Sequence, residues 1–414
     1  MREDILTTEL QKVSSESQRR ELYSMDWLDD KDKIIEGAFA ECYLKMHPMI
    51  CIHGILFTID GIVSDESGIK NDIYSMVRPY VTSGLARKVE QLLQTIKLEA
   101  YSEPLPLQTD RIRVANGTLF LNGEFSEQKD FCLNRLPVIY DLDVEKPARW
   151  LKFMEELLNP DDILTLQEYM GYMLLPTTKA QKMMLIIGKG GEGKSRIGLV
   201  LRELFGNNMY SCSLQKIEVD KFARANLEYM LITVDDDMKL EALPQTNHIK
   251  SIVTLEDQID LERKGQQSFQ GVVYARLIAF GNGGLHALYD KTDGFYRRQL
   301  ILTTKDKVDG REDDPYLIDK LRKERDGIFL WALEGLQRLV SNNYVFTESV
   351  DAKQNLVDAQ EEGNNILAFM KSEGYLQFEI GKKISSTDFY NIYVSWCEDN
   401  LETVSYTHLT LPTN

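Results

Sequence analysis

The sequence predicts an α/β fold built on a mainly parallel sheet, and three observations support that prediction. Short apolar runs alternate with helical patterns from residue 181 onward, namely MMLII (183–187), YMLITV (229–234), YARLIAF (274–280) and RQLILTT (298–304). A glycine-rich loop follows the first run directly, and polar residues end the second and the third. Alternation of this kind is typical of parallel strands that are connected by helical crossovers.

The glycine-rich loop, GKGGEGKS at 188–195, matches the pattern G-x-x-x-x-G-K-[ST] without a mismatch. In this pattern backbone N–H groups surround a phosphate, Lys194 meets the β- and γ-phosphates, and the Ser195 hydroxyl binds Mg²⁺. An apolar run precedes the loop and a helical pattern follows it, so a chance glycine turn is the weaker interpretation. The predicted nucleotide contacts are Gly188, Lys189, Gly190, Gly191, Glu192, Gly193, Lys194, Ser195 and Arg196.

Three acidic residues, Asp235, Asp236 and Asp237, follow the second apolar run. Carboxylates at the end of a buried strand are costly unless they are paired, and Mg²⁺ with its waters would relieve that cost. Strand alternation puts Asp235 and Asp237 on one face and Asp236 on the other. We favour Asp236 as the metal-binding carboxylate beside Ser195, and all three are candidates for polarising water. A solvated acidic turn is the alternative interpretation.

Two further polar signals follow in chain order. Asn282 ends the third apolar run, where an amide could orient water or contact the γ-phosphate. Arg297 and Arg298 precede the strand-forming part of the fourth run, and a guanidinium that meets transition-state charge can be worth roughly 10³–10⁵ in rate. Each signal is weak alone, since Asn before Gly is usually a turn residue and an arginine pair is usually solvated. The order of acid, amide and arginine strengthens both.

The ordered set Lys194, Asp236, Asn282 and Arg298 resembles the superfamily III helicases. More narrowly, the chain resembles the phage and plasmid primase-helicases and their poxvirus relatives, over roughly residues 105–400. The resemblance implies a P-loop (AAA+-like) ATPase core that uses ATP and Mg²⁺. It also implies an ATP-driven DNA helicase that acts in replication of a phage, plasmid or other mobile element. Glu192 departs from the family pattern, because such loops often carry Asn there.

A segment between the acids and Asn282, IKSIVTLEDQIDLERKGQQSFQ (249–270), resembles an extra motif of the same family. In the family this motif forms a hairpin that grips single-stranded DNA in the channel of a ring. The matching positions here are Lys250, Thr254, Arg263 and Lys264. An ordinary basic turn is the alternative interpretation of ERKG.

The resemblance also implies an assembly and partners. Superfamily III proteins form rings, usually hexamers, and a head-to-tail interface lets Arg297 or Arg298 enter the nucleotide site of a neighbouring subunit. Single-stranded or forked DNA is the implied substrate. A separate primase or polymerase is a further implied partner, because no primase motif is recognised before residue 100. The implied location is the cytoplasm of a bacterial host cell.

The expected organisation has four parts and a tail. Residues 1–100 form an N-terminal α+β region of unknown role, and residues 101–178 resemble the lead-in domain of the family. Residues 179–305 form the ATPase core, and residues 306–404 form a helical region with the start of a winged-helix module. The end, SYTHLTLPTN (405–414), does not continue that module and reads as an unrelated tail.

Composition limits the remaining classes of protein. The chain has 48 basic and 65 acidic residues and a net charge of −17, which argues against a protein that coats nucleic acid but permits local basic patches. The five cysteines show no disulfide framework, and the five histidines form no metal-ligand pattern. No apolar run reaches the roughly 18–20 residues of a membrane span, and the charged N-terminus contains no visible signal peptide.

Three other functions compete with the helicase. A protein-remodelling ATPase would share the nucleotide residues but would be expected to carry an aromatic pore loop in place of ERKG. A GTPase switch would need an Asn-Lys-x-Asp motif, which the sequence lacks. A hydrolysis-deficient origin-binding assembly factor would keep the nucleotide residues without turning ATP over.

Overall fold

The computed structural model describes residues 26–238, 243, 245–254, 258–265, 267–285, 293–307, 314–363, 366, 369–370, 372–379 and 381–400. The chain divides into two compact units, Met1–Tyr140 and Asp141–Asn414, and each is described by itself. The predicted unrelated tail at 405–414 lies outside the described residues.

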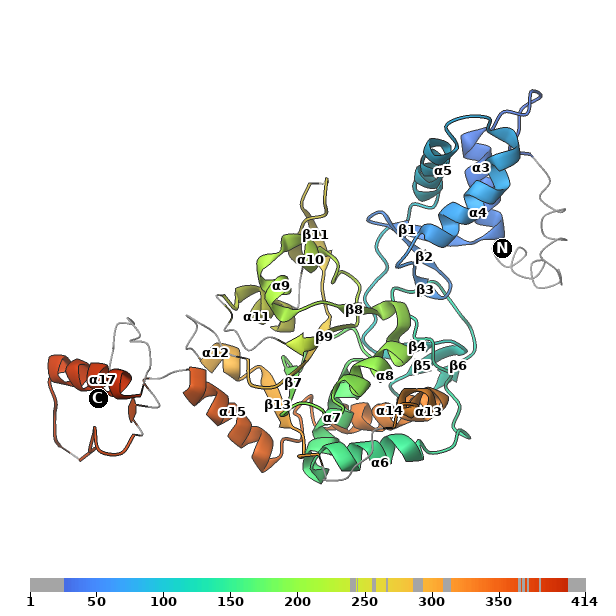
Figure 1. Ribbon diagram of the computed structural model, residues 1–414. Helices are drawn as coiled ribbons and strands as arrows, with labels where there is room; N and C mark the ends of the chain where they lie inside the picture. Colours follow the sequence, from blue (N-terminus) through green and yellow to red (C-terminus); the bar gives the residue numbers. More distant parts are fainter. Residues whose placement is uncertain are drawn as a thin grey trace. The chain divides into compact units, whose positions relative to one another are not determined.

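The first unit begins with helices around a small apolar core (Figure 1). Its elements up to residue 100 are α3 (Glu36–Met46), β1 (Met49–Ile52), β2 (Ile55–Thr58), β3 (Gly61–Ile62), α4 (Ser67–Val77), η1 (Arg78–Tyr80) and α5 (Leu85–Glu99). The three strands form an antiparallel sheet in the order β1–β2–β3. Thr58 pairs with Gly61 across the β2–β3 turn, at the Asp60-Gly61 dipeptide that favours a hairpin.

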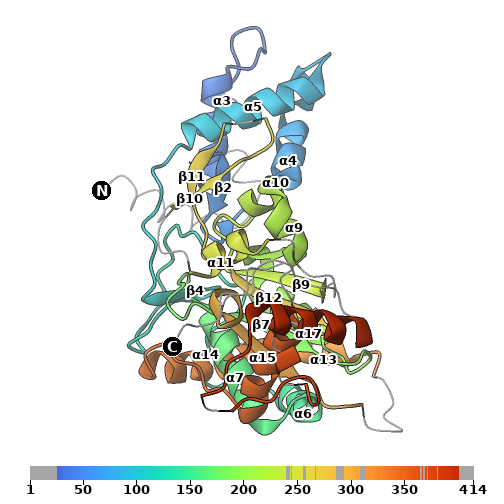
Figure 2. The same ribbon diagram turned by 90° about the vertical axis from the view of Figure 1, so that its left-hand side faces the viewer.

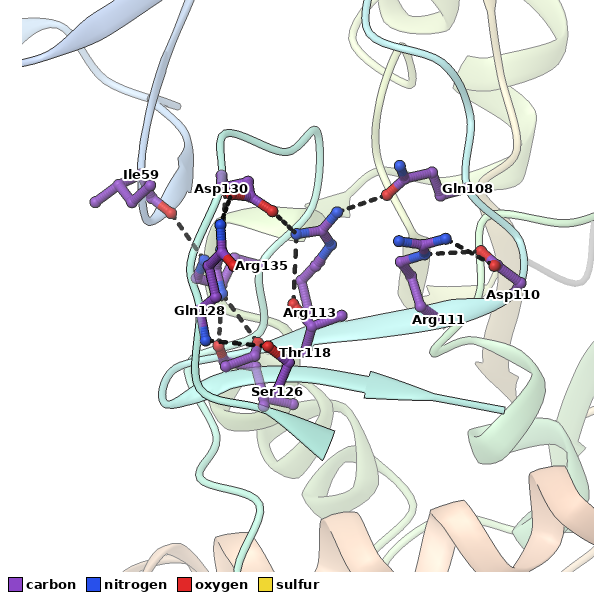
Figure 3. A network of polar contacts seen from close by, with 12 residues as sticks. Ile59, Gln108, Asp110, Arg111, Arg113, Thr118, Ser126, Gln128, Asp130 and Arg135 are labelled. Atoms are coloured by element: carbon purple, nitrogen blue, oxygen red, sulfur yellow. Dashed lines mark hydrogen bonds and ion pairs between the residues drawn. The ribbon is translucent and has the colours of Figure 1, made fainter. Parts of the chain in front are cut away.

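A second antiparallel sheet completes the first unit, and a buried arginine ties it to the β2–β3 turn. Its strands are β4 (Arg111–Val114), β5 (Gly117–Phe120) and β6 (Phe125–Ser126). The Arg135 guanidinium donates hydrogen bonds to the carbonyl oxygens of Ile59 and Val114, each at 2.8 Å, and of Gly117 at 3.1 Å (Figure 3). Arg135 therefore has a structural role, because its donors meet backbone carbonyls.

The second unit contains a five-stranded sheet in which every neighbouring pair is parallel, so the predicted α/β class is confirmed. The strand order is β13–β7–β12–β9–β8. The strands are β7 (Met183–Ile187), β8 (Met209–Ser211), β9 (Ile232–Met238), β12 (Arg276–Gly281) and β13 (Gln299–Thr303). The carboxyl ends of parallel strands meet at one edge, so the segments after β7, β9 and β12 lie close together.

Short helices and one hairpin connect these strands. The connecting elements are α8 (Ser195–Phe205), η2 (Gly206–Asn208), α9 (Leu214–Val219), α10 (Lys221–Ala225), α11 (Asn247–Thr254), β10 (Gln258–Leu261), β11 (Phe269–Val272) and α12 (Asp293–Tyr296). The β10–β11 pair is an antiparallel hairpin, as the family resemblance of residues 249–270 implies, and it extends away from the sheet in both views (Figures 1 and 2).

Helices that precede and follow the sheet strands in the chain pack on one another in this unit. They are α6 (Ala148–Leu157), α7 (Pro160–Tyr172), α13 (Leu317–Lys323) and α14 (Arg325–Ser341), whereas α15 (Val350–Gly363) packs on β13 and α12. Two glycines permit close approach of α7 and α14: a Cβ on Gly171 would lie 2.4 Å from the Leu336 nitrogen, and one on Gly335 would lie 2.2 Å from the Gln167 carbonyl oxygen. A larger residue at either position would force the helices apart.

The observed division of the chain differs from the expected boundaries at residues 100 and 178. The Glu324 carboxylate accepts hydrogen bonds from the backbone N–H groups of Arg149 and Trp150, each at 2.9 Å, and so caps α6 from a distant part of the chain. Together with the α7–α14 packing, this contact joins α6 and α7 to the sheet unit. The expected lead-in region is therefore cut at Tyr140.

The last described helix, α17 (Ser386–Asp399), has an apolar cluster of its own. Ser385 caps it, since its hydroxyl oxygen accepts a hydrogen bond from the Asp388 N–H at 3.0 Å. The buried members of the cluster are Phe369, Phe389, Tyr393, Trp396 and Cys397. This helix is the one with which the expected winged-helix module begins, and the continuation from residue 401 lies outside the described residues.

Candidate functional site

The glycine-rich loop leaves the carboxyl end of β7 and enters the amino end of α8. Gly190, Gly191 and Gly193 have φ values of 107°, 86° and 108°, a backbone region that side chains with a Cβ rarely adopt. Gly188 is required for a different reason, because a Cβ there would lie 2.1 Å from the Thr304 hydroxyl and 2.9 Å from the Lys194 ammonium. The loop can therefore follow this path only with glycines at these positions.

A pocket of about 390 Å³ opens at this edge of the sheet. Ten of the predicted site residues line it: Gly190, Gly191, Glu192, Gly193, Lys194, Ser195, Arg196, Asp236, Asp237 and Asn282. The loop after β7, the last residues of β9 and the residues at the end of β12 thus each supply part of the wall, as parallel strands with a shared carboxyl edge allow. We refer to this space as the loop pocket.

Lys194 is the central cation of the loop pocket, and its side chain is only 8% exposed. Its ammonium donates to the Glu192 carboxylate at 2.8 Å and lies 3.5 Å from the Asn282 side-chain oxygen. The other Glu192 oxygen accepts a hydrogen bond from the Gly190 N–H at 2.7 Å. Burial raises the pKa of Glu192, but the bonds from Lys194 and from backbone N–H groups outweigh it and hold the pKa below its usual range. The residue is therefore ionised at neutral pH.

The three acidic residues after the second apolar run separate into two roles. Asp236 and Asp237 are exposed and line the loop pocket. Asp235 is buried, and its carboxylate accepts a hydrogen bond from the Leu214 N–H at 2.9 Å. Asp235 thus binds the first residue of α9, and burial raises its pKa.

A β-bulge explains why strict alternation is wrong for these residues. Asp235 pairs with Ala279 and Met238 pairs with Gly281, so two residues of β9 lie opposite one residue of β12. The extra residue in a bulge shifts the following side chain relative to the pleat. Asp236 and Asp237 can consequently both reach the pocket, and Asp235 and Asp237 do not share a role.

Replacing Asp235 by alanine should destabilise the fold, because it leaves the Leu214 N–H of α9 without its acceptor. Loss of a buried acceptor costs about 1–3 kcal/mol, which equilibrium unfolding in urea would measure. Asp237→Ala is the matched control, since this exposed neighbour is expected to change stability by less than about 0.5 kcal/mol. Equal stability of the two variants would contradict the structural role of Asp235.

The remaining catalytic candidates lie at opposite ends of the sheet strands, Asn282 at the carboxyl end and the two arginines at the amino end. Asn282 follows β12, which lies between β7 and β9, so its amide is placed between the loop and the acids. Arg297 and Arg298 instead precede β13, and the Arg298 carbonyl accepts a hydrogen bond from the N–H of Met183 at the start of β7. One five-residue strand, about 16 Å, therefore separates the two arginines from the loop. The Arg298 guanidinium also donates to the Gly294 carbonyl.

The β10–β11 hairpin carries the predicted nucleic-acid contacts in unequal environments. Lys264 is exposed at its turn. Arg263 is paired with the buried carboxylate of Glu228, and its guanidinium lies 4.7 Å from the Phe269 ring centre. Lys250 is partly buried on α11, and its carbonyl accepts from the Thr254 hydroxyl at 2.9 Å. Of these three cations, Lys264 has the most exposed side chain and is the most accessible to a DNA strand.

The predicted residue Lys189 does not line the loop pocket, and four residues that were not predicted do. Lys189 points away from it, since its side chain is 80% exposed and pairs with Asp306 at 2.8 Å. Phe280, Gly281, Asp314 and Leu317 line the pocket as well. No sequence motif marks Asp314 or Leu317, because α13 reaches the site only through tertiary packing.

Acidic, histidine and cysteine side chains could contribute to a metal site. Over the described ranges, no group of three or more His, Cys, Asp or Glu side chains could hold a metal ion by itself. Mg²⁺ would therefore need phosphate oxygens as further ligands, beside the Ser195 hydroxyl and the Asp236 carboxylate, and oxygen donors of this kind fit it. Among the helices of the described residues, none has the length and apolar character needed to cross a membrane.

Comparison with known proteins gives a family match and a fold match. The model of DUF5906, a family of unknown function, matches residues 186–298, a stretch that includes the glycine-rich loop, the acids, the hairpin and both arginines. Two solved apo structures of the NrS-1 C-terminal region (305–718) are similar in fold, each with 11% sequence identity. One has a TM-score of 0.52 and covers 86% of this chain and 85% of its own, and the other has 0.50, 78% and 74%. The chain thus shares the overall fold of the NrS-1 C-terminal region.

Proposed function

We propose that this chain is an ATP-driven, ring-forming DNA helicase that acts in replication of a phage, plasmid or other mobile element. The observation that carries the proposal is the loop pocket. It brings together Lys194, Ser195, Asp236 and Asn282 at one edge of a parallel sheet. Lys194, Asp236 and Asn282, followed by Arg298, stand in the order of the superfamily III helicases, and the chain shares its overall fold with the NrS-1 C-terminal region.

Each residue of the loop pocket has a chemical task in ATP hydrolysis. Bound ATP would supply the phosphoanhydride bond, and Mg²⁺ would supply positive charge that offsets the negative charge of the phosphates. Lys194 would bind β- and γ-phosphate oxygens, with backbone N–H groups of the loop and the amino end of α8 beside it. Ser195 and Asp236 would hold the metal. Asp237 and Asn282 are exposed at the same edge and could orient the attacking water.

The position of the two arginines favours action between subunits. Arg297 and Arg298 lie at the amino edge of the sheet, whereas the loop pocket lies at the carboxyl edge. Neither arginine can therefore complete the pocket of its own chain. A head-to-tail ring would bring the amino edge of one subunit to the pocket of the next, which is the arrangement that the resemblance implies.

The hairpin supplies the proposed contact with the DNA strand. A strand that passes through a ring needs few cations from each subunit, because several copies of the same contact add together. The net charge of −17 therefore does not oppose DNA binding at a local basic turn. A protein-remodelling ATPase would use the same pocket, and DNA dependence separates the two functions. A separate primase or polymerase is the proposed partner in replication.

The decisive experiment measures ATP turnover with and without single-stranded DNA, on a sample whose mass in solution is determined at the same time. We expect assembly in the presence of ATP and DNA, and turnover that rises with DNA and falls as salt increases. Turnover without any DNA response would favour protein remodelling. Nucleotide binding without turnover in an assembled ring would favour the origin-binding factor.

Replacing Lys264 by alanine should weaken the DNA response. Loss of one phosphate contact lowers the slope of log affinity against log salt by about 0.7 for single-stranded DNA, and DNA-stimulated turnover should fall with it. A titration with an oligonucleotide at several salt concentrations measures both effects. Lys152→Ala removes the same charge from an exposed position on α6 and serves as the control. If the two variants give identical salt slopes, Lys264 does not contact the DNA strand and the contact lies at other residues.

A further inference from the structure

The Glu192 carboxylate occupies the part of the loop pocket where a phosphate would bind. It accepts from the Gly190 N–H at 2.7 Å and from the Lys194 ammonium at 2.8 Å, which are donors of the two kinds that the motif offers to phosphate. Its side chain is 4% exposed, although it belongs to a surface loop. Its two oxygens thus satisfy donors that line the pocket.

We infer that Glu192 is an autoinhibitory latch, which holds the loop closed until a nucleoside triphosphate displaces its carboxylate from Lys194 and Gly190. The inference rests on the proposed nucleotide site and adds a regulatory residue to it. The Gly190 N–H is a single donor, so it cannot bond Glu192 and a phosphate oxygen at the same time. The Lys194 ammonium has three N–H groups, but a phosphate that binds it must approach the negatively charged Glu192 carboxylate that is already bound there. Binding of ATP and engagement of Glu192 therefore compete.

Electrostatics and backbone freedom both support a latch. The carboxylate is ionised and would repel the triphosphate if it stayed in the pocket, so it must leave when phosphate enters. Gly191 and Gly193 flank Glu192, and glycines allow the backbone rotation that turns a side chain out. Gly190 and Gly191 are themselves exposed, so the displaced carboxylate has solvent beside it.

The test compares ATP affinity between the 414-residue wild-type chain and its Glu192→Gln variant. Glutamine keeps the size of the side chain and can still accept from Gly190, but it has no charge for Lys194 and does not repel phosphate. We expect affinity for MgATP to rise about tenfold, which corresponds to about 1.4 kcal/mol, by isothermal titration calorimetry. Glu203→Gln is the matched control, because it removes the same charge from α8 at a residue that pairs with Arg322 outside the pocket.

A second measurement separates nucleotide binding from a loss of stability if the variant folds less well. Melting temperatures with and without MgATP should show a less stable apo form for Glu192→Gln and a larger increase on adding nucleotide. Equal affinity and an equal melting shift in wild type and variant would overturn the latch while leaving the nucleotide site intact. Absence of MgATP binding in both proteins would overturn the nucleotide site itself, and the latch with it.

Discussion

Replacing Lys194 by alanine is expected to reduce ATP hydrolysis at least about a hundredfold, the usual loss when one positioned donor to transition-state charge is removed. Lys194 lies within hydrogen-bonding distance of both Glu192 and Asn282, at 2.8 Å and 3.5 Å. Steady-state release of phosphate at saturating ATP and DNA measures the effect. Wild-type turnover in this variant would remove the loop from the mechanism.

The same substitution has a structural consequence that needs its own control. Without Lys194, the buried carboxylate of Glu192 loses its counter-charge, and an uncompensated buried charge can destabilise a protein by roughly 3–5 kcal/mol. The double variant Glu192→Gln/Lys194→Ala removes both charges and should recover much of that stability. We expect it to remain inactive. Recovery of turnover together with stability would mean that Lys194 acts only by pairing with Glu192.

Replacing Arg298 by alanine is expected to lower turnover by roughly 10³–10⁵, the range for a guanidinium that stabilises transferring phosphate. Binding of ATP should persist, because Arg298 lies at the sheet edge opposite the loop pocket. Calorimetry and phosphate release on the same sample separate binding from hydrolysis. Arg297→Ala belongs in the same series, since Arg297 is exposed whereas Arg298 also bonds to Gly294.

Mixing variants tests whether the arginine acts between subunits. The Arg298→Ala variant keeps an intact pocket, and the Asp236→Asn variant keeps Arg298. A mixed interface can therefore combine the intact pocket of one subunit with the Arg298 of its neighbour. Random mixing in equal amounts should restore roughly one quarter of the wild-type sites in a head-to-tail ring. Turnover that stays at the level of the two separate variants, at every mixing ratio and with mixed assemblies demonstrated, would argue against action in trans.

Local signals in the sequence were sufficient for the sheet and for much of the pocket. Apolar runs of strand length predicted the inner strands β7, β9 and β12, because an inner parallel strand is buried on both faces and consists mainly of apolar residues. A further apolar run predicted β13, an edge strand whose first four residues are buried. The glycine pattern predicted the β7–α8 loop, since its positive φ values at Gly190, Gly191 and Gly193 require glycine. The β10–β11 hairpin was implied by the family resemblance of residues 249–270 and not by a local signal, and the short edge strand β8 has no clear apolar run.

Other features depend on contacts between distant residues and have no local signal. Glu324 caps α6 from about 175 positions away, so the boundary at Tyr140 follows from packing and not from composition. The bulge opposite Phe280 is a property of strand pairing, and it separates the capping role of Asp235 from the pocket position of Asp236. Pairing of Arg263 with Glu228 likewise appears only when the hairpin packs on the core.

The sequence alone determined which chemistry this chain can offer: a loop able to surround phosphate, acids for a metal, an amide and arginines, in that order. Residue types and short-range spacing suffice for this, because strand burial and glycine conformations are local properties. Tertiary structure alone decided which of these groups meet. It placed Glu192 against Lys194, turned Asp235 away from the pocket, and put both arginines at the far edge of the sheet, because strand order and register are set by long-range pairing.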